Sequence, residues 1–586
     1  MLYPKNPLAQ TVIQLCKAKN IQHIVISPGS RNAPLTIGFT NDPYFSCYSI
    51  VDERCAGFFA LGIAQQLESP VVLVCTSGSA LLNYYPAVAE AFYSDIPLVI
   101  LSADRPKYLI GIGDGQTINQ KNVFENHILN SANLKLNFEH GPKNNNEAEP
   151  AIIKSIENKL ERILGVKQEL DDENETKINT ALNRAISSNG PVHINIPFEE
   201  PLYETTDKLE VKPKVIDVEV RKKKIDDFFI QECYDDWNSY SKKMILIGAN
   251  QPNKIEQQIL DDLSKDNSVI VFTETTSNVH NKQFFNSIDK IIAPLTEEEF
   301  KQLQPDVLVT FGGLIVSKKI KGFLRKFQPK HHWHIDKKHA NDTFFCLDKH
   351  IEATPNQFFN ALLPRLTHFV KSDYKPFWND VKSHRENKQL TYLNDIPYSD
   401  FKVFDAVLKA IPEQSILQLG NSSAVRYAQL FDLKKSIQVF CNRGTSGIDG
   451  STSTAIGCAK ARKEQTTLIT GDLSFFYDSN ALWNNFIPNN FRIILVNNQG
   501  GGIFRILPGD KNSKKFETFF ETTHDLTAKH LCKMYDFDYA TAINEKQLKT
   551  QLKTFFTETN QPKLLEIFTP RIINDQVLLD YFKFIK

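Results

Sequence analysis

The sequence lacks several features that would each define a class of protein. No apolar run reaches the roughly 18 residues that cross a bilayer. The first residues, MLYPKNPLAQ, lack the basic and then apolar layout of a signal peptide. Lys and Arg (68) balance Asp and Glu (68), and this zero net charge argues against nucleic acid or an anionic membrane as the main partner. We therefore expect a cytoplasmic protein.

Signals for metals and nucleotides are also missing. The nine cysteines include no C-x-x-C pair, so neither a zinc ribbon nor a redox site is indicated, and a disulfide framework is not expected in so long a chain. There is no Walker A motif, and the glycines of residues 111–115 (GIGDG) do not fit the Rossmann pattern G-x-G-x-x-G. Residues 331–334 (HHWH) have no carboxylate or cysteine at ligand spacing, so structural roles are favoured for these histidines.

What the sequence does contain is a repeated α/β pattern. A chain of 586 residues is too long for one hydrophobic core, and its composition, 41% hydrophobic and 23% charged, is that of an ordinary globular protein. Short apolar runs bounded by Gly, Ser or Pro alternate with helical segments such as 53–67, which predicts parallel sheets covered on both faces. The expected strands are 23–27, 48–51, 71–75, 98–102, 192–196, 244–248, 269–272, 307–311, 332–335, 416–419, 438–441, 467–470, 492–496 and 564–567.

Polar stretches divide this pattern. Residues 141–175 are rich in Asn, Glu and Lys, and we expect a solvated helix or loop there. Charged residues at 212–214 and 221–224 predict a linker, as do the polar residues 372–394. The fold class is therefore α/β, with three doubly wound parallel-sheet domains at 1–205, 206–370 and 395–586, and a linker at 371–394.

The strongest motif lies in the third domain. The expected strand 467–470 is followed by Gly471-Asp472-Leu473-Ser474, and the strand 492–496 by Asn497-Asn498-Gln499 and then Gly500 to Gly502. One strand–helix–strand unit separates Asp472 from Asn498, so both should lie at the same edge of the sheet. A carboxylate, an amide oxygen and a backbone carbonyl suit Mg²⁺, and glycines let the backbone approach a diphosphate. Each motif alone would fit ordinary turn chemistry, and their spacing favours function.

Here the chain resembles the thiamine diphosphate (ThDP) enzymes, whose metal–diphosphate motif begins GDG and ends NN. Leu473 replaces the last Gly of GDG. With the three glycines, this resembles the branch that makes 2-succinyl-5-enolpyruvyl-6-hydroxy-3-cyclohexene-1-carboxylate in menaquinone biosynthesis. The segments 26–31 (ISPGSR), 51–54 (VDER), 76–80 (TSGSA), 102–106 (SADRP) and 442–450 (NRGTSGIDG) agree with that branch, whereas the middle domain matches weakly.

The resemblance implies pyrimidine-binding, middle and diphosphate-binding domains, with the cofactor between the first domain of one subunit and the third of another. The expected assembly is a homodimer, or a tetramer made of two such dimers. Asp472, Asn498 and Gly500 would hold Mg²⁺ or Mn²⁺. The cofactor-binding residues implied are Glu53, Thr76, Ser77, Gly78, Ser422, Ser446, Gly447, Ile448, Gly471, Asp472, Leu473, Ser474, Asn498, Gly500, Gly501 and Ile503.

Glu53 opens an expected helix, where an acidic residue also complements the helix dipole. The resemblance instead places this carboxyl group against N1′ of the aminopyrimidine. There it would promote the imino tautomer that removes the C2 proton, and partial burial would keep its pKa from falling too low.

Cations at strand–helix junctions form the second constellation. Alone, each arginine at such a junction would be a surface ion-pair partner. Four of them together suit a substrate with several carboxylates, and they are Arg31, Arg105, Arg426 and Arg443. The resemblance implies catalytic roles for Glu53, Ser30, Arg31 and Gln116. It implies a substrate pocket made of Ser30, Arg31, Arg105, Gln116, Ser422, Arg426, Arg443, Ile503, Phe504 and Leu507, with Lys318 as a weaker candidate.

The activity implied is that of a transferase, a decarboxylating carboligase that joins 2-oxoglutarate to isochorismate. One alternative is a ThDP-dependent 2-oxo acid decarboxylase or an acetohydroxyacid synthase, which would need fewer cations. Another is a non-catalytic protein of the same fold, which would have no need of Glu53, Asp472 and Asn498.

Overall fold

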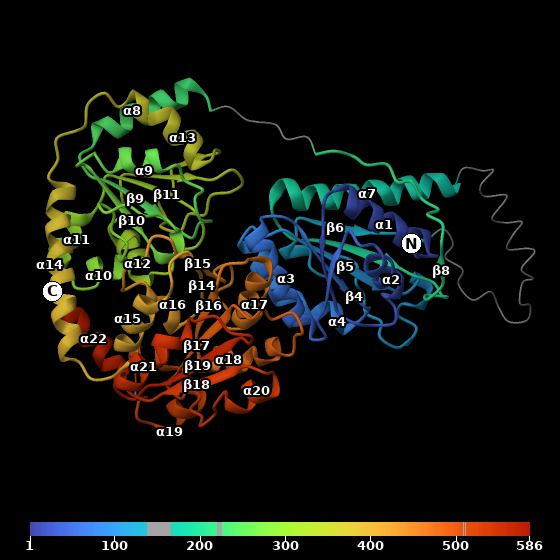
Figure 1. Cartoon of the computed structure of the whole chain (residues 1–586). Coiled ribbons are helices and arrows are strands. Elements are labelled where there is room, and N and C mark those ends of the chain that lie inside the picture. The colour runs from blue at the N-terminus through green and yellow to red at the C-terminus, as the bar shows by residue number, and fades with distance from the viewer. Residues whose placement is uncertain (137–165, 219–224, 508, 510) are drawn as a thin grey trace, which may run out of the picture. The chain divides into compact units, whose positions relative to one another are not determined.

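The computed structural model describes residues 1–136, 166–218, 225–507, 509 and 511–586. They form two compact units (Figure 1). The first unit spans residues 1–220 with 452–463 and 478–488, and the second spans 221–451 with 464–477 and 489–586.

The first unit contains a six-stranded parallel sheet in the order β3-β2-β4-β5-β7-β6. On one face, α1, α2 and α7 pack against alternate strand residues such as Ile24 and Val72. Its elements are β1 (Tyr3–Pro4), α1 (Pro7–Ala18), β2 (His23–Ile26), α2 (Ala33–Asn41), β3 (Ser46–Ser49), α3 (Glu53–Leu67), β4 (Val71–Cys75), α4 (Ser79–Asn83), α5 (Tyr85–Tyr93), β5 (Leu98–Asp104), β6 (Asn130–Asn133), α7 (Val166–Ser188), β7 (Val192–Pro197) and β8 (Thr205–Thr206).

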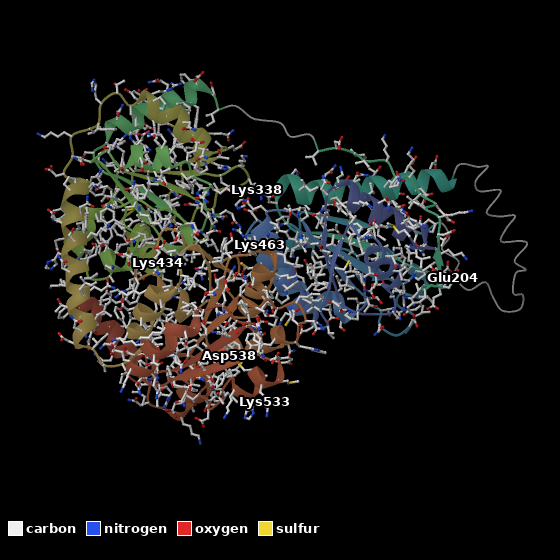
Figure 2. The ribbon with its side chains drawn as sticks, in the orientation of Figure 1. Glu204, Lys338, Lys434, Lys463, Lys533 and Asp538 are labelled. Carbon is white, nitrogen blue, oxygen red and sulfur yellow. The ribbon has the colours of Figure 1, made fainter. Side chains whose placement is uncertain are left out.

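Two further contacts complete this unit. β1 pairs antiparallel with β8, and Lys5 Nζ lies 2.7 Å from the carboxylate of Glu204. Glu204 lies beside β8 in this unit and is labelled in Figure 2. α17 (Ser451–Ala461) packs closely on α3, because a Cβ added at Gly62 would lie 2.1 Å from the backbone oxygen of Thr454. The glycine therefore lets the two helices touch through their backbones.

The second unit begins with a five-stranded parallel sheet in the order β10-β9-β11-β12-β13. Its elements are α8 (Asp227–Ser239), β9 (Lys243–Ile247), α9 (Gln257–Leu263), β10 (Val269–Thr273), α10 (Ile288–Ile292), α11 (Glu297–Leu303), β11 (Val307–Phe311), α12 (Lys318–Lys326), β12 (His331–Ile335), β13 (Lys349–Ile351), α13 (Pro355–Leu362) and α14 (Tyr374–Asp395).

A second six-stranded parallel sheet comes next in the chain, in the order β15-β14-β16-β17-β19-β18. Its elements are α15 (Asp400–Ala410), β14 (Ile416–Leu419), α16 (Ser423–Ala428), β15 (Gln438–Cys441), β16 (Thr466–Gly471), α18 (Asp472–Tyr477), β17 (Phe491–Asn497), α19 (Lys514–Phe516), α20 (Lys529–Met534), β18 (Asp538–Ala542), α21 (Glu545–Phe555), β19 (Lys563–Phe568) and α22 (Asn574–Phe584).

The two six-stranded sheets share one topology. With the strands of each sheet counted in chain order, both read 2-1-3-4-6-5. Strand order therefore reverses between β2 and β4 in one sheet and between β14 and β16 in the other. Parallel sheets bind ligands at the carboxyl ends of the strands on either side of such a reversal.

The α/β class with parallel sheets, predicted from the sequence, is confirmed. Every strand expected from the sequence is present to within two residues at each end, and the helix expected at 53–67 has those bounds. The prediction missed the short pair β1 and β8, and it missed β6, β13 and β18, which are edge strands. An edge strand faces solvent along one side, so it needs no continuous apolar run.

The polar stretches have mixed outcomes. Residues 141–165 and 221–224 lie outside the described residues, and Val166 begins α7. Much of the linker predicted at 371–394 is the helix α14. This helix buries Trp378 against the five-stranded sheet and Tyr392 in the core of the second six-stranded sheet. The buried positions of α14 recur at helical spacing among charged residues, which is why the composition suggested a linker. The three domain ranges stay predictions.

The histidines of β12 have structural partners. Thr310 Oγ1 lies 2.9 Å from His332 Nε2 and 2.8 Å from His334 Nδ1, while His331 Nδ1 lies 2.8 Å from Asp348. Among the described residues, no helix is both long and apolar enough to cross a membrane.

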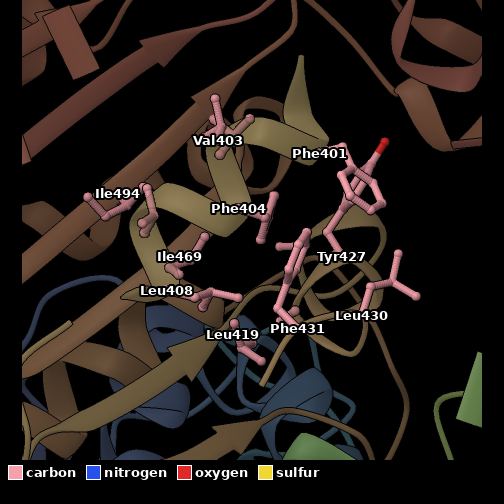
Figure 3. Packing of buried hydrophobic residues seen from close by; sticks show 14 of the residues in the cluster. Phe401, Val403, Phe404, Leu408, Leu419, Tyr427, Leu430, Phe431, Ile469 and Ile494 are labelled. Carbon is pink, nitrogen blue, oxygen red and sulfur yellow. The ribbon is translucent and has the colours of Figure 1, made fainter. Parts of the chain in front are cut away.

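The core of the last sheet centres on α15. Its fully buried Phe401 packs beside Phe404, Tyr427 and Phe431 (Figure 3). The ring centroid of Phe401 lies 4.6 Å from that of Tyr581 and 5.0 Å from that of Phe431. This cluster fixes the beginning of α15 against α22.

We predict that Phe401→Ala lowers the free energy of unfolding by about 3–5 kcal/mol, because it leaves a cavity in a packed aromatic cluster. Urea unfolding followed by far-UV circular dichroism measures the change. Phe228→Ala is the control, since that side chain is 79% exposed. Equal unfolding midpoints for the two variants would contradict the prediction.

Candidate active site

Apart from Lys318, the site residues predicted from the sequence follow strands of the two six-stranded sheets, at the carboxyl edges of those sheets. Ser30, Glu53, Thr76 and Arg105 follow β2, β3, β4 and β5 in the first unit. In the second unit, Ser422 follows β14, the segment 443–448 follows β15, Asp472 follows β16, and the segment 498–507 follows β17. Each sheet therefore gathers its own set at the edge where the strand order reverses.

Glu53 is the first residue of α3. The side chain of Asp52 caps this helix by accepting from the Cys55 backbone N–H at 3.1 Å, which is standard N-cap chemistry. Asn83 Nδ2 donates to Glu53 Oε2 at 3.4 Å, and Glu53 is partly exposed. Its carboxyl group is therefore accessible at the carboxyl edge.

The turn at Thr76–Gly78 needs glycine. Gly78 has a φ of +89°, and a Cβ there would lie 3.2 Å from the backbone oxygen of Gln116. Gln116 itself has a φ of +54°. Arg105 connects the two segments, because its guanidinium donates to Ser77 Oγ at 2.7 Å and to the Gln116 carbonyl at 3.0 Å. The structure thus brings these four predicted residues together.

The cations of the first unit are partly paired. Arg105 Nε donates to Asp114 at 2.6 Å, and Arg31 donates to the Phe198 carbonyl at 3.2 Å. Burial, and then the charge of Arg105, lower the pKa of Arg31. The two guanidinium groups therefore repel each other, and an anion between them would be favoured. Ser30 is exposed beside Arg31.

Sequence reasoning missed Gln120, which is buried beneath this turn. Its Oε1 accepts from the Gly78 N–H at 2.9 Å, and its Nε2 donates to Asn195 Oδ1 at 2.8 Å. Asn195 Nδ2 donates in turn to Asp104, whose other oxygen accepts from the Arg105 N–H. Gln120 therefore connects the turn at Thr76–Gly78 to the end of β5, which Arg105 follows.

In the second unit, Asp472 is the first residue of α18 and is 2% exposed. Its Oδ1 accepts from the Leu473 N–H at 2.6 Å, and its Oδ2 from the Gly500 N–H at 3.0 Å. His524 Nε2 lies 3.4 Å from Oδ2, and the nearby carboxylate of Asp472 raises the pKa of His524. The expected adjacency of the segments at Asp472 and Gly500 is thus observed.

The segment 446–448 reaches the same edge. Ser474 Oγ donates to the Ile448 carbonyl at 2.9 Å, and Asn421 Nδ2 donates to the Gly447 carbonyl at 2.7 Å. Ser446 takes the left-handed conformation, with a φ of +61°. Half-buried Ile448 therefore lies beside the helix that begins at Asp472.

A hydrogen bond to Glu521 fixes the position of the glycine loop after β17, which contains Gly500 to Gly502. The carbonyl of Glu521 accepts from the Gly501 N–H at 2.6 Å, and a Cβ at Gly500 would lie 2.8 Å from that oxygen. The fully buried carboxylate of Glu521 accepts from both Arg505 and Arg571. In the same loop, Ile503 is half-buried, whereas Phe504 and Leu507 are exposed, as an apolar wall for a ligand would require.

The predicted arginines of the second unit, Arg426 and Arg443, lie near Lys321 on α12, which packs on the five-stranded sheet. Arg443 donates to Asn421 Oδ1 at 2.8 Å, and Arg426 donates to the carbonyl of Ser422 on its own helix. Burial, and then Arg443, lower the pKa of both Arg426 and Lys321. Lys321 was not predicted, and the weaker candidate Lys318 is exposed at the first turn of α12.

Three buried polar atoms of predicted site residues have no hydrogen-bond partner in the described part of the chain. They are Arg31 Nε and Thr76 Oγ1 in the first unit and Arg443 Nε in the second. Buried polar groups are nearly always paired, so each of these atoms is left to hydrogen-bond to a water or a ligand.

The donor set at Asp472 fits a hard divalent cation. No group of three or more His, Cys, Asp or Glu side chains among the described residues could hold a metal. A cation here would therefore rely on one carboxylate, an amide oxygen from Asn498, a backbone carbonyl and ligand phosphate, as Mg²⁺ often does. Asn498 Nδ2 donates to Asp400, whose pKa burial raises to about 6.

Comparisons with known proteins agree with this geometry. A model of the thiamine pyrophosphate enzyme N-terminal TPP binding domain matches residues 7–131, and one of the C-terminal TPP binding domain matches residues 420–567. These models define the class as the thiamine pyrophosphate enzymes.

Relatives define the branch of that class. A 2-succinyl-5-enolpyruvyl-6-hydroxy-3-cyclohexene-1-carboxylate synthase from Flavobacterium psychrophilum is 56% identical and one from Christiangramia forsetii 57%, each over 100% of both chains. The synthase of Porphyromonas gingivalis is 36% identical over 98% of this chain and 96% of its own. The chain therefore belongs to this synthase family of transferases in menaquinone biosynthesis. This membership favours the synthase activity over that of a pyruvate enzyme and over a non-catalytic role.

We predict that Glu521→Gln lowers the stability of the second unit by about 3–5 kcal/mol, because Arg505 and Arg571 lose a buried anionic partner. Thermal unfolding of the ligand-free protein measures the loss. Glu517→Gln is the matched control, since its partly exposed carboxylate contacts Arg571 alone among these residues and should change stability by less than about 1 kcal/mol. Equal melting temperatures would contradict a fastening role for Glu521.

Proposed function

We propose that the protein joins 2-oxoglutarate to isochorismate, with release of CO₂, to give 2-succinyl-5-enolpyruvyl-6-hydroxy-3-cyclohexene-1-carboxylate. The observation that carries this proposal is the full-length match to synthases of that name. We also propose that the protein acts in the cytoplasm.

The diphosphate end of ThDP belongs at the second six-stranded sheet, with Mg²⁺ or Mn²⁺ between it and the protein. Asp472, Asn498 and the carbonyl of Gly500 are the proposed metal ligands. Their support is the buried carboxylate at the end of β16 and the glycine loop fastened beside it. Ile448 is the proposed apolar support for the cofactor, since its carbonyl is fixed to α18 through Ser474.

The aminopyrimidine end belongs beside Glu53, which would exchange a proton with N1′. Because Glu53 and Asp472 lie in separate compact units, we propose a homodimer in which each cofactor takes Glu53 from one subunit and Asp472 from the other. Two such dimers would form the tetramer. When bound, the cofactor supplies a carbanion equivalent and an electron sink for loss of CO₂.

The protein's own contribution is charge and orientation. Both substrates are dicarboxylates, and planar guanidinium groups match carboxylates. Arg31 and Arg105 in one unit, and Arg426 and Arg443 in the other, are the proposed partners. Burial, and then the neighbouring arginine, lower the pKa values of Arg31 and Arg426, and a bound dianion would favour the charged form of each pair. Ser30, Gln116 and Ser422 would donate neutral hydrogen bonds.

An assay of CO₂ release tests the whole proposal. We expect release from 2-oxoglutarate in the presence of isochorismate, and a product whose mass is the sum of the two substrates less CO₂. Pyruvate should give little release under either condition. Equal turnover of pyruvate would instead indicate a general 2-oxo acid decarboxylase.

We predict that Glu53→Gln lowers kcat by about 10²–10⁴-fold, because the amide cannot exchange a proton with N1′. Steady-state kinetics measure the effect, and circular dichroism checks the fold. Glu68→Gln, at the exposed end of the same helix α3, is the matched control. Near-normal turnover of Glu53→Gln would remove this residue from the mechanism.

We predict that Arg443→Ala raises KM for a dicarboxylate substrate by about tenfold to a hundredfold, because one charge-assisted hydrogen bond is lost. The affinity for ThDP should change little. Arg443→Lys keeps the charge but not the planar fork, so we expect an intermediate KM. Unchanged kinetics with both substrates would count against this pocket residue.

A further inference from the structure

Asp400 is a buried carboxylate to which the proposed function assigns no role. It is the first residue of α15 and is 2% exposed. In the described part of the chain, its hydrogen-bond partners are hydroxyl and amide groups rather than a cation. A buried charge without a counter-charge costs stability, so a functional role for Asp400 would explain why an acidic residue occupies this position.

The partner of interest is Asn498. Its Nδ2 donates to Asp400 Oδ2 at 3.0 Å. An ionised carboxylate only accepts hydrogen bonds, so it can face only the NH₂ end of an amide. The amide oxygen of Asn498 is thereby turned away from Asp400. An asparagine without such a neighbour could present either end to a cation, and the NH₂ end would repel it.

Asp400 is itself held on several sides. Thr569 Oγ1 donates to Asp400 Oδ1 at 2.6 Å, and the backbone N–H of Asp400 donates to Asn574 Oδ1 at 2.9 Å. The Thr569 N–H also donates to the carbonyl of Asn497, the residue before Asn498, at 3.1 Å. The carboxylate and the amide that it orients are therefore fixed to the same two strand ends, those of β17 and β19.

A second effect is charge. Asp472 accepts from Gly500, and Asp400 accepts from Asn498, two residues earlier on the same strand end. Two buried carboxylates thus contact one short segment. A divalent cation beside that segment would offset the negative charge of both.

We propose that Asp400 is a positioning residue for the divalent cation, which keeps the amide oxygen of Asn498 turned toward the metal and adds a second negative charge behind it. This inference rests on the proposed function, in which Asn498 is a metal ligand. Outer partners that orient metal ligands typically contribute about 10–100-fold to metal affinity.

The test is calorimetric titration of MgCl₂ into the protein in the presence of excess ThDP, which reads binding rather than activity. We expect Asp400→Asn to weaken Mg²⁺ binding by about 10–100-fold, since the new amide can donate to the Asn498 oxygen and turn it inward. Asp405→Asn is the matched control, because Asp405 lies on the same helix and its carboxylate pairs with exposed Lys409. Wild-type Mg²⁺ affinity in Asp400→Asn would overturn the inference.

A double-mutant cycle separates orientation from general damage to the fold. We expect Asn498→Ala to lose Mg²⁺ affinity, and Asp400→Asn to add much less in that background than in the wild type. Fully additive losses would overturn the inference. Wild-type affinity in Asn498→Ala would instead refute the proposed metal ligand itself. If Asp400→Asn does not fold, Thr569→Val takes its place in the cycle, with a smaller loss expected and the same non-additivity required.

Discussion

The structure depends on one property of parallel sheets, which is that the carboxyl ends of all their strands meet at one edge. Backbone groups at that edge are not fully paired, helix N-termini face it, and the chain can place a different side chain there after each strand. Both six-stranded sheets use the strand order 2-1-3-4-6-5. Each therefore gathers functional side chains at its carboxyl edge, where Glu53 begins a helix after β3 in one sheet and Asp472 begins a helix after β16 in the other.

That property explains why the fold and much of the candidate site could be predicted from the sequence. A buried parallel strand must be apolar on both faces, so runs such as 71–75 stand out, and the residues directly after each run must lie at the edge. The strand–helix–strand spacing between Asp472 and Asn498 could therefore be converted into proximity, and the hydrogen bond from Gly500 to Asp472 shows that proximity. The roles of these residues came from the resemblance to a family rather than from the pattern.

The residues that sequence reasoning missed are buried polar residues that hydrogen-bond to the turns of the candidate site. Gln120, Asp400 and Glu521 contact the site turns from segments far along the chain or through a loop of irregular structure. Asp400 at a helix start looks like an ordinary dipole-complementing residue, and Gln120 looks like a polar loop residue. Only the folded chain shows that each is buried and fully committed to a partner.

These hidden groups share a physical logic. Glycine turns at a ligand site must be free of side chains, so their own conformation is weakly determined, and something else must fix it. Gln120 fixes Gly78, and Glu521 fixes Gly501, each through a backbone hydrogen bond and a buried polar anchor. Such anchors cost desolvation, so an intact buried pair is worth little more than apolar residues of the same volume, although removing one partner of the pair is costly. Their benefit lies in orientation, because a donor or acceptor fixed before the ligand arrives loses less freedom when it binds. The stability that they cost must come from the apolar cores beneath the sheets, and the aromatic cluster around Phe401, at the start of the same helix as Asp400, is one such source.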